Sequence, residues 1–280
     1  MHVTERLAKW ATNVAPEHTP AARLSARHAI QDVVGCMTAG AGDEGAAKVR
    51  DAVNGLGDGR SVIVGRLAQT SSSYAALANG MAAHALDFDD TFLESITHAS
   101  AVLVPALFAL GDEMNASGAD IVDAYIVGLE LHGALGKALN RSHYDQGWHA
   151  TSTLGVIGTA GACARLMKLD ETRFAHAMNL AFSSCAGTKV QFGSMAKPLH
   201  AGLAAKNAVE AAKLAAAGVE GHLNAFEGPM GMMQMYGGPG APGWDAAFKV
   251  LGGALAIERQ GLTVKRFPCC AATHRALDCV

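Results

Sequence analysis

Charged and aromatic residues are scarce in this chain of 280 residues. Charged residues make up 17% of it and aromatic residues 6%, and the formal net charge is only −3. A small negative charge gives no electrostatic footprint for nucleic acid or for an anionic membrane surface. Net charge describes the whole surface and not one pocket, so a local anion site stays open.

Long apolar runs and paired cysteine motifs are missing as well. No stretch reaches eighteen uninterrupted apolar residues, which predicts no membrane span. The first residues lack a basic region followed by an apolar run, which predicts no signal peptide. The cysteines form no paired CxxC knuckles, and adjacent cysteines are poorly placed for a mutual disulfide. We therefore expect reduced thiols in a cytoplasmic protein at Cys36, Cys163, Cys185, Cys269, Cys270 and Cys279.

Signatures of several enzyme classes are also absent. The chain has no GxSxG, which leaves an α/β-hydrolase nucleophile elbow unsupported. It has no Walker A sequence and no strand-linked GxGxxG, so a nucleotide site is not expected. EF-hand spacing and HExxH are missing too, and the glycine-rich run 237–240 contains proline and follows no strand.

What the chain does have is helical periodicity. The one convincing strand signal is the β-branched run 61–65, between glycines. Alanine and glycine give several helices flat surfaces that let their axes approach closely. We therefore predict an all-α fold, a large helical bundle, rather than a two-layer α/β domain. The apolar spacing and capping residues predict helices over 5–14, 21–38, 72–92, 117–139, 154–166, from 170 onward and over 201–217.

Two segments interrupt this helical pattern. Residues 227–243 are rich in glycine, proline and methionine and predict a loop, whose methionines serve as packing or as a flexible wall of a site. Residues 273–278 read as the first turn of a helix, with only two residues after them. We expect the chain to be part of a longer protein.

The stretch from His84 to His98 concentrates the polar chemistry of the chain. It holds three carboxylates, two histidines and hydroxyl groups in an apolar context, where burial of such groups is costly. On the predicted helix, His84, Asp87 and Thr91 share one face that borders the core. There a carboxylate can have a raised pKa and act as a base.

Two other interpretations of this stretch stay open. The acids can form a solvated helix end. The three aspartates with His84 and His98 can also hold a divalent cation, although DxDD on a helix points its carboxylates in different directions.

Cationic groups lie elsewhere in the sequence. Lys197 precedes Pro198, and proline favours the first helical position, which places the ammonium at an N-cap beside free backbone N–H groups. An anionic ligand shared with those groups explains that placement, and an exposed lysine is the alternative. His149 precedes a Gly/Ala-rich helix and is either structural or functional. Lys265 lies five residues before Cys270, whose thiol is either activated by nearby cations or a small hydrophobe.

These segments together resemble the MmgE/PrpD family. The resemblance rests on 84–91, 97–98, 147–151, 197–202 and 267–274 and runs along essentially the whole chain. The family includes 2-methylcitrate dehydratase, cis-aconitate decarboxylase and iminodisuccinate epimerase. The resemblance implies a large helical domain, a smaller α+β lid and a homodimer. It also implies a site between the two domains with no required metal, nucleotide or iron–sulfur cluster. On this basis we expect the helical domain at 1–262 and the start of the lid at 263–280.

The resemblance also implies roles for particular residues. As catalytic residues we expect Asp87, His98, His149, Lys197, Lys265 and Cys270. As substrate-binding residues we expect Thr91, His84, His200 and His274. Cys270 is a departure, because it stands where the decarboxylase branch has a histidine-bearing sequence.

The substrates of the family share a bond to hydrogen or to a carboxylate next to another carboxylate. We expect a lyase that abstracts a proton from a small di- or tricarboxylate, with Asp87 or His98 as the base. Loss of water is the primary expectation, that is, a 2-methylcitrate dehydratase-like reaction. Epimerisation and decarboxylation are the alternatives. In a different class, the chain is an inactive helical binding or scaffold subunit.

Overall fold

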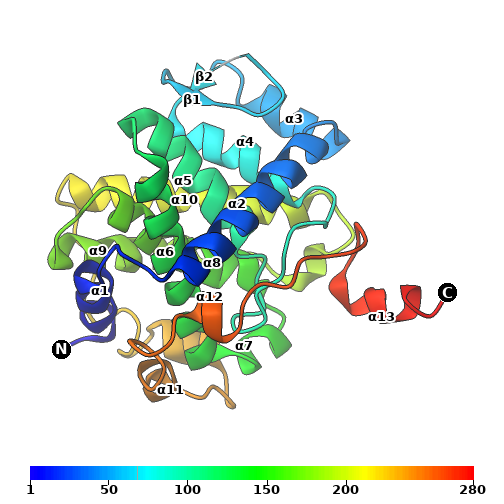
Figure 1. Ribbon diagram of the computed structural model, residues 1–280. Coiled ribbons are helices and arrows are strands. Elements are labelled where there is room, and N and C mark those ends of the chain that lie inside the picture. Colours follow the sequence, from blue (N-terminus) through cyan, green and yellow to red (C-terminus); the bar gives the residue numbers. More distant parts are fainter. Residues whose placement is uncertain (68) are drawn as a thin grey trace.

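The computed structural model describes residues 1–67 and 69–280. The predicted helical bundle is confirmed (Figure 1), with helices in chain order. They are α1 (Val3–Asn13), α2 (Pro20–Gly40), α3 (Glu44–Ala52), α4 (Ser72–His84), α5 (Ser100–Met114), α6 (Gly118–Leu139), α7 (Ser142–Asp145), α8 (Ala150–Leu166), α9 (Glu171–Phe182), α10 (Ala196–Ala216), α11 (Trp244–Phe248), α12 (Ala256–Arg259) and α13 (His274–Leu277). Short 3₁₀ turns lie at η1 (Lys189–Gln191) and η3 (Ala271–Thr273), and a π-helical turn lies at η2 (Met233–Gly237).

The helix starts follow the capping residues that the sequence offers. The Ser117 hydroxyl accepts from the backbone N–H of Asp120 at 3.1 Å, and the Asp120 carboxylate accepts from the Ser117 N–H at 3.3 Å. This reciprocal pair is the predicted capping box of α6. The Asp170 carboxylate likewise accepts from the N–H of Arg173 at 2.9 Å and caps α9.

The predicted strand at 61–65 is shorter than expected. Only Ser61–Val62 (β1) is extended, and it pairs antiparallel with Gln69–Thr70 (β2), Ser61 opposite Thr70. This small ribbon lies at one end of the bundle, at the top of Figure 1. It contributes little to the core, and the fold is carried by helix packing.

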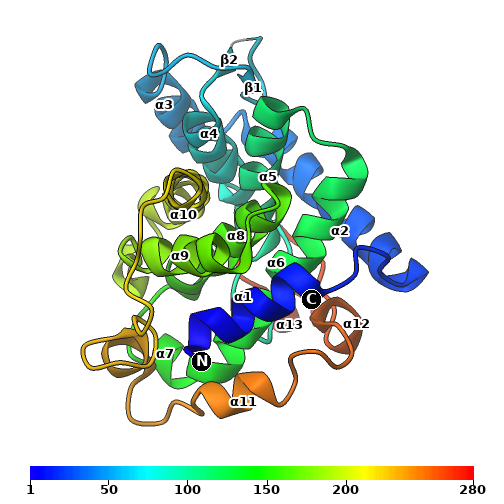
Figure 2. The same cartoon turned by 90° about the vertical axis from the view of Figure 1, so that its left-hand side faces the viewer.

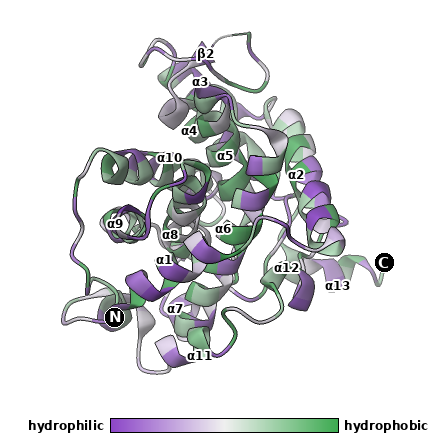
Figure 3. Cartoon of the chain, turned by 60° about the vertical axis from the view of Figure 1, so that its left-hand side comes forward, coloured by the Kyte–Doolittle hydropathy of each residue, from purple (hydrophilic) through white to green (hydrophobic). Residues whose placement is uncertain are grey.

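The middle of the bundle is made by α5, α6 and α8. Every residue of α8 is buried except Arg165. Colouring by hydropathy shows these central helices as largely apolar, with polar residues on the outer helices (Figure 3). A helix that is enclosed on all sides needs no polar face, which explains why α8 lacks one.

Glycines let α4 and α10 pack in close contact, as the flat helix surfaces predicted. A side-chain carbon on Gly202 would lie 2.4 Å from the carbonyl oxygen of Leu77. One on Gly80 would lie 2.7 Å from the α-carbon of Gly202. This close approach matters for the site, because α4 ends and α10 begins beside the same cavity.

The predicted helix over 72–92 is wrong in its second half. Helix α4 ends at His84, and residues 85–99 form a loop in which Asp87 has a φ of 49°. Aspartate tolerates this left-handed conformation better than most residues. The acidic side chains find partners in the loop that a straight helix would not offer, because Asp89 bonds His84 and Asp90 bonds Ser100.

The chain after the methionine-rich segment returns to the bundle. Residues 227–243 are mainly loop as predicted, although they include the turn η2. Residues 263–280 then run along one flank to α13, which lies apart from the main bundle (Figure 1). The view turned by 90° shows the same helices from the side (Figure 2). Among the described residues, no helix is long and apolar enough to cross a membrane.

Candidate active site

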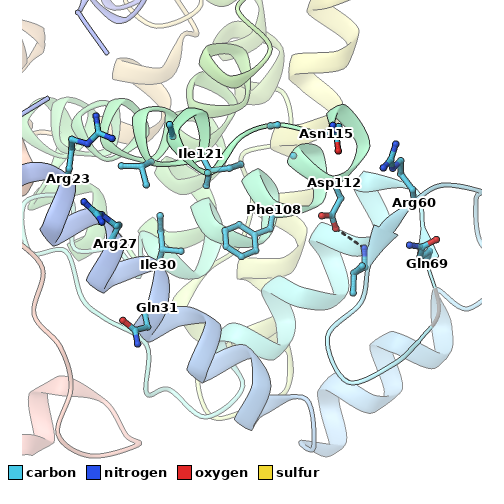
Figure 4. Close-up of a pocket in the computed structure, with 16 residues that line it drawn as sticks. Arg23, Arg27, Ile30, Gln31, Arg60, Gln69, Phe108, Asp112, Asn115 and Ile121 are labelled. Atoms are coloured by element: carbon cyan, nitrogen blue, oxygen red, sulfur yellow. Dashed lines mark hydrogen bonds between the residues drawn. The ribbon is translucent and has the colours of Figure 1, made fainter. Parts of the chain in front are cut away.

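Two cavities of similar volume are present. One, of about 890 Å³, lies between α2, the α5–α6 connection and the β1–β2 ribbon (Figure 4). Arg23 and Arg27 reach it from α2, and Asp112 accepts a hydrogen bond from the backbone N–H of Val62 at 3.0 Å. None of the histidines, thiols or hydroxyls predicted for the site lines it.

The other cavity, of about 910 Å³, gathers most of the predicted residues. Its wall comes from the 85–99 loop, the start of α8, the 192–198 segment and the 270–275 segment. These parts are distant in sequence and converge only in the folded chain. Seven of the ten predicted residues line it: His84, Asp87, Thr91, His98, His149, Lys197 and Cys270.

Two lysines hold the carboxylate of Asp87. The Lys197 ammonium donates to one carboxylate oxygen at 2.5 Å, and Lys265 donates to the other. Lys265 also donates to the carbonyl oxygen of Asp87 at 2.7 Å. The Lys265 side chain has no exposed surface, whereas those of Lys197 and Asp87 are 15% and 23% exposed. One partner of the carboxylate is thus fixed inside the protein and the other faces the cavity.

Backbone pairing brings Lys265 to this position. Thr91 and Thr263 exchange N–H to carbonyl hydrogen bonds, both of 2.9 Å, in an isolated antiparallel bridge. The bridge joins the acidic loop to the segment that carries Lys265 two residues later. No local sequence pattern encodes such a long-range pair.

The expected raised pKa of Asp87 is wrong. Burial alone disfavours the charged carboxylate, but the hydrogen bonds from Lys197 and Lys265 outweigh it. The pKa of Asp87 therefore lies below its usual range. A carboxylate held as an anion by two ammonium groups is a poor base, so Asp87 serves better as an electrostatic anchor.

Lys197 was predicted to be at the N-cap and lies two positions beyond it. Helix α10 begins at Ala196 with Met195 as its N-cap, so Lys197 is the second helical residue and not the cap. It remains in the first turn, near the positive end of the helix dipole. His149, in contrast, is the N-cap residue of α8.

A buried carboxylate links two of the histidines. Asp89 has no exposed surface, and its oxygens lie 2.9 and 3.1 Å from Nδ1 of His84. One of the same oxygens lies 3.1 Å from Nδ1 of His98, which also donates to the carbonyl of Asp90 at 3.0 Å. The two imidazole rings are 4.3 Å apart between centroids.

The other nitrogen of each ring, Nε2, has a different environment. Nε2 of His98 lies 3.8 Å from an oxygen of Asp87, and Nε2 of His84 has no hydrogen-bond partner among the described residues. Burial lowers the pKa of His84 to about 4, although Asp89 opposes this shift. The His84 ring is therefore neutral near pH 7 and Asp89 is ionised.

His149 and His200 form a second histidine pair. Their Nδ1 atoms are 2.9 Å apart, so one ring donates to the other. Burial, with the nearby His84 and His98 rings, holds the pKa of His149 well below its usual value, and burial also lowers that of His200. His200 supports His149 from behind and does not line the cavity.

Hydroxyl groups complete the polar wall. The Thr151 hydroxyl accepts from the backbone N–H of His98 at 3.0 Å, which ties the start of α8 to the acidic loop. The Thr91 hydroxyl is buried beside the cavity and has no partner among the described residues. An unsatisfied hydroxyl of this kind is suited to a ligand oxygen.

Cys270 and His274 differ in their placement. Cys270 is exposed and lines the cavity, together with Arg275 of the same segment. His274 does not line the cavity, and its ring meets the Phe267 ring edge-on at 5.3 Å between centroids. Its expected role in substrate binding has no support in this geometry.

Four side chains of the site are close enough together to hold a metal ion. One ligand atom each from His84, Asp87, Asp89 and His98 lies within 4.8 Å of the others. The two carboxylates are already engaged, since Asp87 holds two ammonium groups and Asp89 accepts from two imidazoles. A cation would have to displace these partners, so the arrangement fits the lysine–carboxylate network better.

Sequence reasoning missed several residues of the cavity. Arg141, Tyr144 and Phe192 line it, and Arg275 adds a further cation. Asp89 was part of the acidic motif but was not singled out. Its five-residue spacing from His84 is not a helical contact distance, so only the loop geometry reveals the pair.

Comparison with known protein families identifies the family of this chain. The model of the MmgE/PrpD N-terminal domain matches residues 5–245. The chain belongs to the MmgE/PrpD family.

Three curated relatives of this MmgE/PrpD chain are named cis-aconitate decarboxylase. Cis-aconitate decarboxylase from Homo sapiens is 32% identical over 74% of this chain and 43% of its own length. The protein of that name from Mus musculus is 31% identical over 74% of this chain and 42% of its own length. Cis-aconitate decarboxylase from Aspergillus terreus is 26% identical over 99% of this chain and 59% of its own length. The chain thus spans about half the length of the curated relatives it matches.

Proposed function

We propose that this chain supplies the substrate-binding and proton-moving groups of a lyase. The substrate is a small tricarboxylate of the cis-aconitate type, and the reaction is decarboxylation. The observation that carries the proposal is the pair Lys197 and Lys265 on Asp87, beside the Nε2 atom of His98 at one cavity. A polyanionic substrate needs cations, and a reaction at carbon needs a nitrogen that moves a proton.

Charge stabilisation is the first task of such a site. Cleavage of the bond between carbon and a leaving carboxylate releases CO₂ and leaves an electron pair on the carbon. That pair spreads into the remaining conjugated carboxylate, and Lys197 and Arg275 are placed to neutralise it. One preorganised donor in a site of this kind contributes on the order of 3 kcal/mol to transition-state stabilisation.

Proton delivery is the second task. A proton taken up from solvent by Nε2 of His98 passes to the carbon and completes the product. The ring is held from the other side by Asp89 and by the carbonyl of Asp90. His98 is therefore a better proton carrier than Asp87, whose charge is committed to the two lysines.

Decarboxylation replaces dehydration as the preferred reaction. The sequence favoured a 2-methylcitrate dehydratase-like reaction, with decarboxylation as an alternative. The names of the curated relatives support the alternative. Dehydration remains the second candidate because Cys270 lines the cavity at the position where the decarboxylase branch resembles a histidine-bearing sequence. The homodimer and the lid implied by the family resemblance remain predictions.

Product analysis with cis-aconitate tests the proposal. We expect release of CO₂ and consumption of the acid, both abolished by Lys197→Ala. Lys206→Ala is the matched control, since Lys206 lies on the same helix and pairs with Glu210 at 2.8 Å away from the cavity. A hydrated product without CO₂ would identify a dehydratase. Binding of di- and tricarboxylates with no bond change would identify a binding module.

A further inference from the structure

Asp89 stands apart from the residues that face the cavity. It has no exposed surface and does not line the cavity, so it cannot touch a substrate held there. Its two oxygens nevertheless contact Nδ1 of both His84 and His98 at 2.9 to 3.1 Å. One buried carboxylate therefore bridges two imidazole rings of the site.

This contact decides where each ring carries its proton. An ionised carboxylate has only acceptor atoms, and so does the carbonyl of Asp90 that contacts Nδ1 of His98. Each Nδ1 must therefore carry hydrogen, which leaves the lone pair of each neutral ring on Nε2. The unpartnered Nε2 of His84 and the Nε2 of His98 near Asp87 fit this assignment.

We infer that Asp89 is a positioning residue that fixes the Nδ1–H tautomer and the ring orientation of both histidines. This inference rests on the proposed function, because it assigns the proton-moving nitrogen of that reaction. The same logic operates in serine proteases, where a buried aspartate holds a histidine in the required tautomer and its amide variant is about 10⁴-fold slower.

The amide variant Asp89→Asn changes the hydrogen-bonding groups that the side chain offers to the two rings. An amide oxygen accepts from one Nδ1–H, but the amide NH₂ can only donate. In either orientation of the amide the NH₂ faces Nδ1 of His84, which lies 2.9 and 3.1 Å from the two oxygens of Asp89, and this favours a bare Nδ1 with hydrogen on Nε2 in one ring. The shape of the side chain is nearly unchanged, so an effect comes from the lost charge or from the changed hydrogen-bond pattern, and the tautomers report the second of these.

Asp90→Asn is the matched control. Asp90 is equally buried, but its side chain accepts a hydrogen bond from Ser100. Among the described residues, neither imidazole ring bonds that side chain. The control changes an adjacent buried carboxyl group in the same loop. It should leave both histidine tautomers as they are.

Nitrogen NMR of ¹⁵N-labelled histidine reads the tautomers directly. We expect Nδ1–H for both rings in the native chain, assigned with His84→Gln and His98→Gln. One ring should switch to Nε2–H in Asp89→Asn and neither in Asp90→Asn. The turnover number should fall by about 10²–10⁴-fold in Asp89→Asn, while KM changes little.

The outcomes test the role of Asp89 and the proposed function separately. A neutral ring at His84 or His98 with hydrogen on Nε2 and a bare Nδ1 in the native chain, or unchanged tautomers in Asp89→Asn, would overturn the role of Asp89. The native measurement needs no variant, so it decides the matter even if Asp89→Asn fails to fold. Native chain that shows the expected tautomers but transforms no carboxylic acid would refute the proposed function alone.

Discussion

Lys265 and Asp87 are 178 residues apart in the chain, yet the ammonium of one donates to both the carbonyl and the carboxylate oxygens of the other. The contact closes the acidic loop onto the segment that follows α12. It places an ammonium group beside a carboxylate that Lys197 reaches from the cavity side. The stability of the loop and the charge of the site therefore depend on the same group.

Lys265→Met should destabilise the fold. The variant keeps an unbranched apolar chain but removes the ammonium, so Asp87 keeps only its partly exposed partner Lys197. Loss of one partner of a largely buried ion pair should lower the free energy of unfolding by about 1–3 kcal/mol in urea denaturation. Lys48→Met removes the exposed pair with Glu44 and should have no measurable effect. Equal stability of Lys265→Met and the native chain would show that the contact between Lys265 and Asp87 does not stabilise the fold.

Asp90 should make stability depend on pH. Burial raises the pKa of Asp90 to about 7, a shift that Ser100 opposes and Asp89 adds to. The folded state therefore holds a proton that the unfolded state, with the ordinary value of 3.8, has released. This contribution to stability is full below about pH 4 and is lost as pH rises through about 7, with a total on the order of 2–4 kcal/mol.

Asp90→Asn isolates this contribution because its amide cannot ionise. The free energy of unfolding of the native chain minus that of Asp90→Asn should fall between pH 4 and 7 and stay level above. The buried neutral His132, with a pKa of about 3, gives the opposite slope in acid but cancels in the difference. Glu130→Gln serves as a second measurement, since burial also raises the pKa of Glu130 to about 7. A difference that does not vary with pH would show that Asp90 is ionised in the folded chain.

Close helix contacts can be tested at glycine. Gly202→Ala should destabilise the bundle by about 1–3 kcal/mol, because the added carbon meets the carbonyl oxygen of Leu77 at 2.4 Å. Gly35→Ala, in α2, has nothing within 4 Å and should stabilise by about 0.5–1 kcal/mol through helix propensity. Thermal or urea unfolding measures both. The opposite order of stabilities would refute the close packing of α4 against α10.

The sequence predicted the helices better than the site. Local signals such as the capping box at Ser117 and the cap at Asp170 marked helix starts correctly, because capping involves groups three residues apart. The acidic motif was assigned to a helix because its apolar spacing continued past His84. Tertiary partners for buried carboxylates overrode that spacing, and only the folded chain supplies them.

The residue types in the sequence indicated the site, although the predicted helix through the acidic motif was wrong. Lys197, His149 and Asp87 were selected for their chemistry and do line one cavity. The electrostatic role of Asp87 could not be foreseen, because its second lysine arrives through the bridge between Thr91 and Thr263. Asp89 was overlooked for the same reason, since both of its partners depend on the course of the loop.

The thiols give a chemical test of the cavity. Cys270 is exposed at the cavity wall, whereas Cys36, Cys163 and Cys185 are buried. Burial raises the pKa of Cys36 and Cys163 to about 12, so few thiolate nucleophiles form there at neutral pH. Iodoacetamide should modify Cys270 and leave these buried cysteines intact, as peptide mass spectrometry can measure.

Alkylation should also block the site. The added carboxamidomethyl group on Cys270 occupies space beside Ala271 and Arg275, so tricarboxylate binding should weaken or disappear. Cys270→Ser should bind the acid and resist inactivation. Cys279→Ser is the control, because Cys279 is exposed and does not line the cavity, and that variant should stay sensitive. Full binding after complete modification of Cys270 would show that the acid does not contact this part of the cavity wall.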